Sequence, residues 1–409
     1  MAGSSVEHYL TYQHNVQAYF RAHATKYDGM IIPLSIITAF PSGTYGFVRA
    51  LCTADQDKQY GIDPRSALFQ KKWNRNNVRE PHRKMAEVFG EPFVSKGLTS
   101  HLEPSDFPRN VAEAVTRACL DYQKTFRQRP EDAKKLEKYR KLLGVEHLEP
   151  LRAPQFLVPP YFQFEDLSDP WWKVSIACIE AAIPHTEGLP LRPVLHFQRW
   201  NSVDWTKAFG KLKKLGLPAS WLYANNFREH VEPQEQLNSL VSAVSLAAAA
   251  NLPVYNLFGG YFSILTGRLG LKGFGNGVGY GEWRDSGYHK GGTADRRIYI
   301  LKLHRFLDIP RAQNLVDADP EYFGRDTELL GACVDEKRPL DELTIEECLE
   351  HFMDCRATER TFAASATATE LLDELTGTQA HLAAIGDLEL KEYGSSLERW
   401  RKALEPSLT

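Results

Sequence analysis

One stretch of the sequence combines unusual glycine spacing with side chains that can do chemistry. It reads GFGNGVGYGEWRD, with glycines alternating from Gly273 to Gly281. Alternate glycines leave one face of a strand bare, so a flat ligand can approach the backbone. The predicted substrate contacts in this stretch are Gly275, Gly277, Gly279 and Arg284. The same glycines also suit a strand thinned for a large neighbouring side chain, a bulge, or a backbone nest for phosphate.

This stretch fits no GxGxxG pattern, and the chain has no GxxxxGK[ST]. Both patterns place glycines where a helix start can receive phosphate groups. The sequence therefore excludes a dinucleotide-binding fingerprint here and a P-loop.

Two residues are candidates for proton transfer or nucleophilic attack. Glu282 directly follows the glycine strand, where a carboxylate has space to act as acid, base or nucleophile. A salt bridge to Arg284 or Arg296 is the alternative. His304 follows another predicted strand and is the second catalytic candidate, although a lone histidine there also suits a hydrogen-bonded structural role.

Polar and ring-bearing side chains follow several predicted strands. Such a set suits an organic ligand held by directed hydrogen bonds. The further predicted substrate contacts are Tyr161, His196, Gln198, Asn225, Asn226, Gly259 and Gly260. The asparagine pair would grip the edge of a base or sugar, or would simply form turns.

A basic segment, KKWNRNNVREPHRK at 71–84, is a candidate nucleic-acid contact. Lys71, Lys72 and Arg75 would follow a phosphate backbone while Trp73 stacks on a base. A solvated loop and helix is the simpler interpretation. Any binding of nucleic acid must be local, because the formal net charge of the chain is −3.

No metal or other cofactor is expected. Cys333, Cys348, His351 and Cys355 are the main cysteine and histidine cluster, but their spacing matches no familiar zinc site. The chain contains no CxxC pair, which also argues against a disulfide scaffold. Zinc at this cluster remains an alternative.

Regular alternation of strands and helices would position these residues. From residue 191 onward, apolar runs of strand length alternate with segments of helical spacing, which indicates parallel strands joined by right-handed crossovers. The predicted strands are 30–37, 156–162, 191–197, 220–224, 254–258, 273–281 and 298–303, with an eighth near 92–98. This number favours a (β/α)8 TIM-type barrel over an open doubly wound sheet.

The predicted barrel covers residues 1–330 and carries an insertion at about 60–150. A helical subdomain follows at 331–409, where Thr344 and Glu347 form a capping box. Hydrophobic residues make up 43% of the 409 residues, enough for a large core. We expect a cytoplasmic protein that binds no membrane, because the sequence shows neither a signal peptide layout nor an apolar run of about 18 residues.

The order of the later features resembles the tRNA-guanine transglycosylase superfamily, including its DNA-modifying relatives. GVGYGE at 277–282 is similar to the family's glycine-rich strand, which ends in Glu and borders the nucleobase pocket. IYILKLH, the helix at 312–316, Cys333 and the helix with His351 follow in the family's order. The resemblance covers about residues 250–360. The family's Asp-Ser-Gly-Gly strand end and CxCxxC triplet are absent, and only Ser42-Gly43 is faintly similar to the former, which implies a diverged member with altered or lost catalysis.

Three functions are compatible with the sequence. The leading hypothesis is a transglycosylase-like barrel enzyme that acts at a glycosidic or related bond of a nucleobase-containing substrate, as in nucleic-acid modification. The second is a barrel enzyme for a phosphorylated small molecule, bound at Gly275–Gly279. The third is a nucleic-acid-binding or assembly subunit without catalysis.

Overall fold

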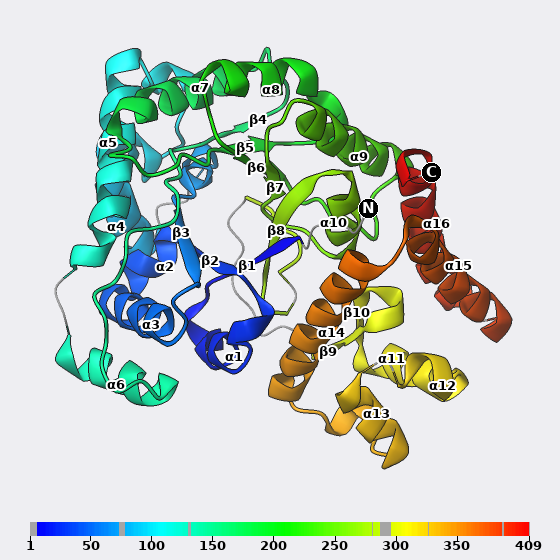
Figure 1. Ribbon diagram of the computed structural model, residues 1–409. Helices are drawn as coiled ribbons and strands as arrows, with labels where there is room; N and C mark the ends of the chain where they lie inside the picture. Colours follow the sequence, from blue (N-terminus) through cyan, green and yellow to red (C-terminus); the bar gives the residue numbers. More distant parts are fainter. Residues whose placement is uncertain are drawn as a thin grey trace.

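A ring of parallel strands forms the centre of the protein, and helices cover its outside (Figure 1). The computed structural model describes residues 6–72, 78–129, 132–279, 281–286, 296–325, 327–386 and 388–408. Within these ranges one sheet has eight strands in the order β3-β2-β1-β8-β7-β6-β5-β4, and all neighbouring strands are parallel. They are β1 (Glu7–Thr11), β2 (Gly29–Pro33), β3 (Gln59–Asp63), β4 (Gln163–Phe164), β5 (Val194–Phe197), β6 (Ser220–Ala224), β7 (Val254–Asn256) and β8 (Leu271–Gly277).

The two edges of the sheet meet at the segment before β4. Gly61 in β3 forms a parallel bridge with Phe156, and Leu157 forms another with Leu191, just before β5. The Leu157 N–H donates to the Pro190 carbonyl at 2.8 Å. This segment therefore joins β3 to the β5 side of the sheet, and the ring closes. The predicted (β/α)8 TIM-type fold class is confirmed.

Helices follow the strands around the ring. They are α1 (Gln17–Ala22), α2 (Leu34–Ala39), α3 (Pro41–Ala54), α4 (Glu80–Phe89), α5 (Arg109–Thr125), α6 (Ala133–Leu143), α7 (Pro170–Ala182), α8 (Trp205–Lys214), α9 (Gln234–Ala249) and α10 (Tyr261–Thr266). Helices α4 to α6 lie between β3 and β4, within the predicted insertion at about 60–150.

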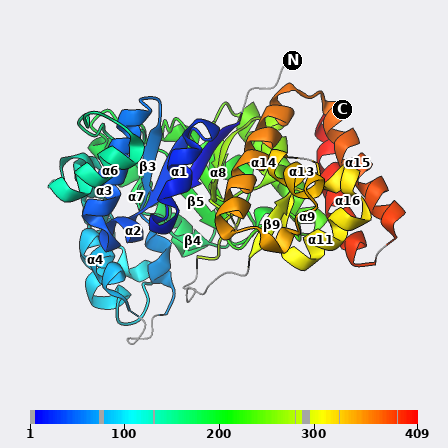
Figure 2. The same ribbon diagram turned by 90° about the horizontal axis from the view of Figure 1, so that it is seen from below.

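The chain after β8 forms a hairpin and a group of helices on one side of the barrel (Figure 2). These elements are β9 (Arg297–Ile300), β10 (Arg305–Asp308), α11 (Ile309–Ala318), α12 (Pro320–Phe323), α13 (Glu328–Asp335), α14 (Ile345–Ser365), α15 (Ala368–Ile385) and α16 (Leu388–Leu408). Helix α14 packs against β9 and α10, and α16 packs against α9. The predicted capping box is present at the start of α14. The predicted domain boundary at residue 330 stays a prediction.

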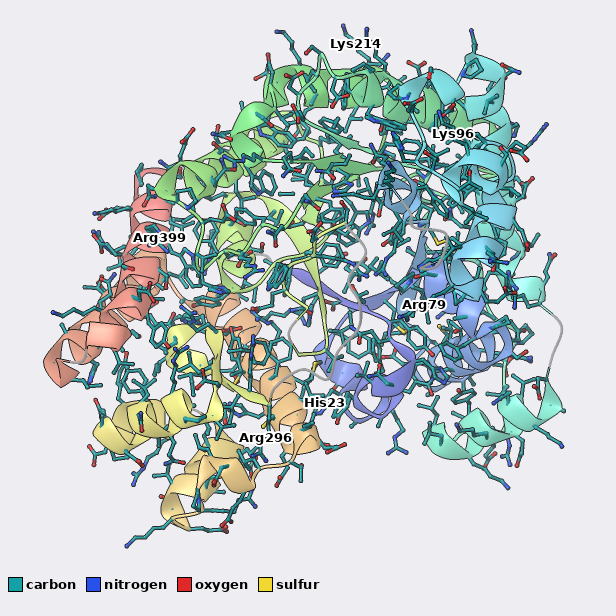
Figure 3. All side chains as sticks on the ribbon, turned by 180° about the vertical axis from the view of Figure 1, so that it is seen from behind. His23, Arg79, Lys96, Lys214, Arg296 and Arg399 are labelled. Atoms are coloured by element: carbon teal, nitrogen blue, oxygen red, sulfur yellow. The ribbon has the colours of Figure 1, made fainter. Side chains whose placement is uncertain are left out.

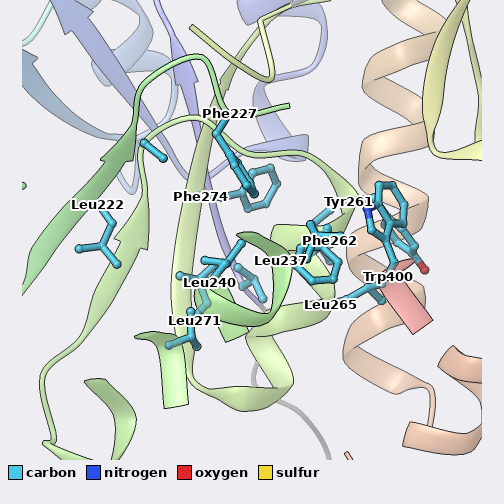
Figure 4. Packing of buried hydrophobic residues seen from close by; sticks show 14 of the residues in the cluster. Leu222, Phe227, Leu237, Leu240, Tyr261, Phe262, Leu265, Leu271, Phe274 and Trp400 are labelled. Carbon is cyan, nitrogen blue, oxygen red and sulfur yellow. The ribbon is translucent and has the colours of Figure 1, made fainter. Parts of the chain in front are cut away.

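Aromatic contacts join α16 to the barrel (Figure 4). Trp400 lies beside Phe262 of α10, with ring centroids 5.9 Å apart, and its indole N–H donates to the Glu229 carbonyl at 2.8 Å. Leu237 and Leu240 of α9 belong to the same buried cluster. The last helix thus helps to hold the segment between β6 and α9.

Large side chains fill the interior of the barrel at one of its two ends. Tyr9, Phe156, Trp221 and Tyr255 form a buried aromatic cluster near the amino ends of the strands. The guanidinium of Arg192 lies 4.0 Å from the Tyr255 ring and 4.1 Å from the Phe156 ring. Side chains likewise occupy the space between the elements throughout the molecule, whereas Lys214 lies at its outer edge (Figure 3). We therefore expect any ligand site of the barrel at the opposite end, where the carboxyl ends of the strands open.

The strand predictions were most accurate from residue 191 onward. The predicted strand at 220–224 coincides with β6, and those at 191–197, 254–258 and 273–281 overlap β5, β7 and β8. The predicted strand at 298–303 is wrong as a barrel element, because β9 pairs antiparallel with β10 outside the ring. The prediction at 92–98 is also wrong, since residues 93–97 form a π-helix. Strands β1 and β3 were missed.

The closing bridge requires a glycine at position 61. A Cβ added there would lie 2.3 Å from Cε2 of Phe156, which is fully buried. We expect Gly61→Ala to lower the free energy of unfolding by roughly 1–3 kcal/mol, measured by urea unfolding. Gly210→Ala is the matched control, because a Cβ in that part of α8 meets no atom within 4 Å and alanine favours helix by up to about 1 kcal/mol. Equal stability of Gly61→Ala and wild type would contradict the closure.

Candidate functional site

A small pocket with a cavity volume of about 20 Å³ lies at the carboxyl ends of the barrel strands. Its walls come from the ends of β3, β6, β7 and β8 and from the segment that leads into β4. The lining residues are Asp63, Arg65, Ala67, Leu68, Tyr161, Tyr223, Phe258, Arg284 and Ser286. Three aromatic rings, two guanidinium groups and one carboxylate therefore face the same small space.

Asp63 organises one side of this pocket. Its carboxylate accepts the backbone N–H of Arg65 at 3.1 Å, the Nε–H of the same arginine at 3.1 Å and the hydroxyl of Tyr161 at 2.8 Å. Arg65 adopts a left-handed backbone conformation with φ 51°, which is uncommon for a residue with a side chain. The bonds to Asp63 hold Arg65 in this conformation. Sequence reasoning missed both residues because it did not predict β3.

Stacked rings form the adjacent wall. The ring of His196 is fully buried and stacks on Tyr223, with centroids 4.0 Å apart and an interplanar angle of 7°. Tyr161 meets His196 edge to face at 5.9 Å. Burial lowers the pKa of His196 to about 3, opposed by the side chain of Asn225. The structure thus brings together the predicted contacts Tyr161 and His196, with His196 neutral at ordinary pH.

The segment after β8 crosses the mouth and carries Arg284 to the pocket. The carbonyl of Arg284 accepts the backbone N–H of Asn226 at 2.8 Å and the hydroxyl of Tyr223 at 3.2 Å. The amide oxygen of Asn225 accepts the backbone N–H of Ser286 at 2.7 Å. The side chain of Asn225 and the backbone N–H of Asn226 therefore hold this segment in place, and contact of either residue with a ligand stays a prediction.

A second, polar cleft of about 480 Å³ lies beside the pocket. Lys71, Gln198, Arg199 and Asp285 are among the residues that line it. Lys71 Nζ is 3.9 Å from the Asp285 carboxylate. Among the other predicted nucleic-acid contacts, Lys72 is exposed. Trp73 and Arg75 lie outside the described residues.

The two predicted catalytic residues belong to a different group, centred on Arg356 of α14. Glu282 forms an ion pair with Arg356, in place of the suggested pairs with Arg284 or Arg296. Glu359 binds Arg356 at 2.7 Å and lies 2.8 Å from Nδ1 of His304. Neither Glu282 nor His304 lines the pocket. The structure therefore places Glu282 and His304 in one cluster, in which Arg356 and Glu359 link them.

Burial determines the protonation of this cluster. Burial raises the pKa of Glu282 to about 8; Glu229 and Glu359 act in the same direction, while Arg356 opposes them. A Cβ at Gly260 would meet Glu282 Oε1 at 2.9 Å and Glu229 Oε2 at 3.0 Å. Gly260 therefore allows two carboxylates to lie close together. The predicted contact Gly259 similarly leaves space for Ser263, whose Oγ would be 2.3 Å from an added Cβ.

The glycines of β8 permit close packing between chain segments. A Cβ at Gly275 would lie 2.5 Å from the Leu257 carbonyl oxygen, and one at Gly279, where φ is 80°, would lie 2.6 Å from Leu349. Gly277 donates its N–H to the Gly281 carbonyl at 3.0 Å, so this donor is not free for a phosphate. The neighbour at Gly275 is a backbone carbonyl, whereas at Gly279, just after β8, it is the side chain of Leu349.

No group of three or more His, Cys, Asp or Glu side chains within the described ranges could hold a metal ion. His351 has both ring nitrogens engaged: Nε2 is 2.7 Å from the Tyr299 carbonyl and Nδ1 is 2.7 Å from the Thr327 hydroxyl. Because a carbonyl only accepts, Nε2 carries the proton and Nδ1 accepts from Thr327. The helices in the described part of the chain include none that is long and apolar enough to span a membrane.

The fold and the pocket define a (β/α)8-barrel protein with a polar site at its carboxyl mouth. No family model and no curated protein matches the chain. Among solved structures, the carboxyl transferase domain of Rhizobium etli pyruvate carboxylase with pyruvate is similar over 100% of this chain, with a TM-score of 0.35 and 8% sequence identity. This chain spans 62% of the length of that one. The likeness is too low to carry an argument about function.

The Arg356 cluster makes stability depend on pH. A carboxyl group whose pKa is higher in the folded than in the unfolded state stabilises the folded protein. This contribution is complete below the unfolded pKa of about 4.3 and is lost as the pH rises through the folded pKa, which is about 8 for Glu282. We expect the free energy of unfolding to fall between about pH 5 and about pH 8, and to fall less steeply in Glu282→Gln. Urea unfolding across this range measures both slopes. Glu113→Gln, on the surface of α5, is the control, and equal slopes for Glu282→Gln and wild type would refute the assignment.

Proposed function

We propose that the chain is a barrel enzyme that acts at a glycosidic or related bond of a nucleobase-containing substrate, bound at the carboxyl mouth. The observation that carries the proposal is the convergence of one carboxylate, two guanidinium groups and three aromatic rings on one pocket. Flat rings suit a planar base, and directed donors and acceptors suit its polar edge.

The rings supply an apolar surface with fixed polar ends. Tyr161 and Tyr223 are buried, and burial raises the pKa of both hydroxyl groups, so each keeps its proton at neutral pH and donates it to Asp63 or to the Arg284 carbonyl. Phe258 forms a further wall without polar atoms. A base in the pocket would meet apolar faces and, at its edge, hydroxyl oxygens that can accept a hydrogen bond.

Asp63 is the carboxylate that we assign to the reacting centre. It lines the pocket, and donors from Arg65 and Tyr161 stabilise its negative charge. A carboxylate in this position can support the positive charge that develops on a sugar when a glycosidic bond breaks. Glu282, predicted for this role from the sequence, is held by Arg356 and is absent from the pocket lining.

The neighbouring cleft offers a path for the rest of the substrate. Lys71 and Arg199 line it next to the pocket mouth, together with the carboxylates of Glu232 and Asp285. A nucleic-acid strand would lay its phosphates along this cleft while one base enters the pocket, as base-modifying enzymes require.

Asp63→Asn tests the proposal. We expect it to lower kcat for base exchange or glycosidic cleavage at least about 100-fold, since a positioned carboxylate contributes on this scale or more. Glu113→Gln, which changes an exposed carboxylate on the surface of α5, is the matched control and should stay within about threefold of wild type. Far-ultraviolet circular dichroism verifies that both variants fold. The proposal fails if folded Asp63→Asn matches wild type, or if wild type shows neither reaction.

A further inference from the structure

The mouth pocket holds more positive than negative charge. Two arginines, Arg65 and Arg284, line it, and Asp63 is the only acidic residue among the described residues that line it. Asp63 already pairs with Nε of Arg65 at 3.1 Å. Burial and the neighbouring Arg65 lower the pKa of Arg284. Two positive charges that are buried close together without a full counter-charge destabilise the folded protein, and a negatively charged ligand would remove this cost.

Arg65 also has an unused donor. Its side chain is 9% exposed, and within the described chain Nη2 has no hydrogen-bond partner. A buried guanidinium N–H without a partner loses its hydration and gains nothing in return. An acceptor atom from a ligand in the pocket would satisfy it.

Both arginines are anchored at the pocket wall, and the bonds that anchor Arg65 leave its Nη2 available. Asp63 fixes Arg65 through its backbone N–H and Nε, and the left-handed backbone at Arg65 persists under this constraint. Arg284 is anchored through its own carbonyl, which accepts from Asn226 and Tyr223. The guanidinium groups therefore approach the pocket from β3 and from the segment after β8, two sides of the mouth.

We propose that Arg65 and Arg284 form an oxyanion subsite of the mouth pocket, so that the substrate carries a phosphate or carboxylate group. The inference rests on the proposed function in one respect, since it names the charged form of the same substrate. A guanidinium presents paired N–H donors that match two oxygens of either group. If the substrate contains a nucleobase, this subsite selects a nucleotide over the free base or the uncharged nucleoside.

Isothermal titration calorimetry with inorganic phosphate and, separately, acetate tests the subsite on the full chain. We expect saturable binding of at least one anion by wild type, and at least about tenfold weaker binding by Arg65→Gln and by Arg284→Gln, since hydrogen bonds to charged groups contribute on this scale. Arg109→Gln is the matched control, because its side chain is 92% exposed on α5. Stronger binding of phosphate than acetate would identify a phosphate subsite, and the reverse order a carboxylate subsite.

Because the subsite contains two arginines, the test still gives an answer if one of the two variants does not fold. If Arg65→Gln unfolds because its bonds to Asp63 are lost, Arg284→Gln still reports on the subsite. Absence of saturable binding of either anion by folded wild type would overturn the inference, as would unchanged binding in folded Arg284→Gln.

Failure of this inference is separable from failure of the proposed function. Anion binding that depends on Arg284, together with no base exchange or glycosidic cleavage, would leave the subsite standing and remove the enzymatic proposal. Turnover that depends on Asp63 but does not discriminate nucleotide from nucleoside would keep the enzyme and overturn the subsite.

Discussion

The carboxylate of Asp63 is the constraint on which the site depends. It binds Arg65 twice and Tyr161 once, and so ties the end of β3 to the segment that leads into β4. Two residues earlier, Gly61 bridges to Phe156 and closes the ring of strands. The same seam therefore completes the barrel and shapes the pocket. Loss of the carboxylate would release the arginine and one aromatic wall together.

A second constraint comes from the helices after the barrel. Arg356 of α14 is fully buried and forms ion pairs with Glu282 and Glu359. Removing the arginine would leave buried carboxylates without a counter-charge, which strongly destabilises a folded protein. Glu282 lies two positions before Arg284, so this ion pair fixes the start of the segment that crosses the mouth. The C-terminal helices thus support the pocket without lining it.

The sequence predicted the barrel best where its pattern was regular. From β5 to β8, apolar runs buried on both faces alternate with amphipathic helices, and the strands lie close to the predicted ranges. Strand β3 reads QYGID, a short run with a central glycine and polar ends, and so gives a weak signal. Its glycine is explained only by Phe156, a residue 95 positions away. A long-range contact of this kind leaves no local pattern.

The candidate site was only partly predicted, because contacts between distant parts of the chain also determine which residues reach it. Tyr161, His196 and Arg284 were expected near a ligand because they follow or end strands, and they do gather at the mouth. Glu282 and His304 also follow predicted strands, but their partners Arg356 and Glu359 lie on α14, far along the chain. Spacing alone does not reveal which of two nearby side chains turns towards the pocket. Asp63 and Arg65 were missed with β3, although a polar Asp-Pro-Arg run after a short apolar alternation is a usable signal.

The most direct measurement of the central claim is a crystal structure of the chain grown with millimolar phosphate. We expect phosphate density between the guanidinium groups of Arg65 and Arg284, with the bonds from Asp63 to Arg65 and Tyr161 intact. Phosphate bound instead at the glycines of β8, or a mouth that remains empty while phosphate occupies another site, would contradict it.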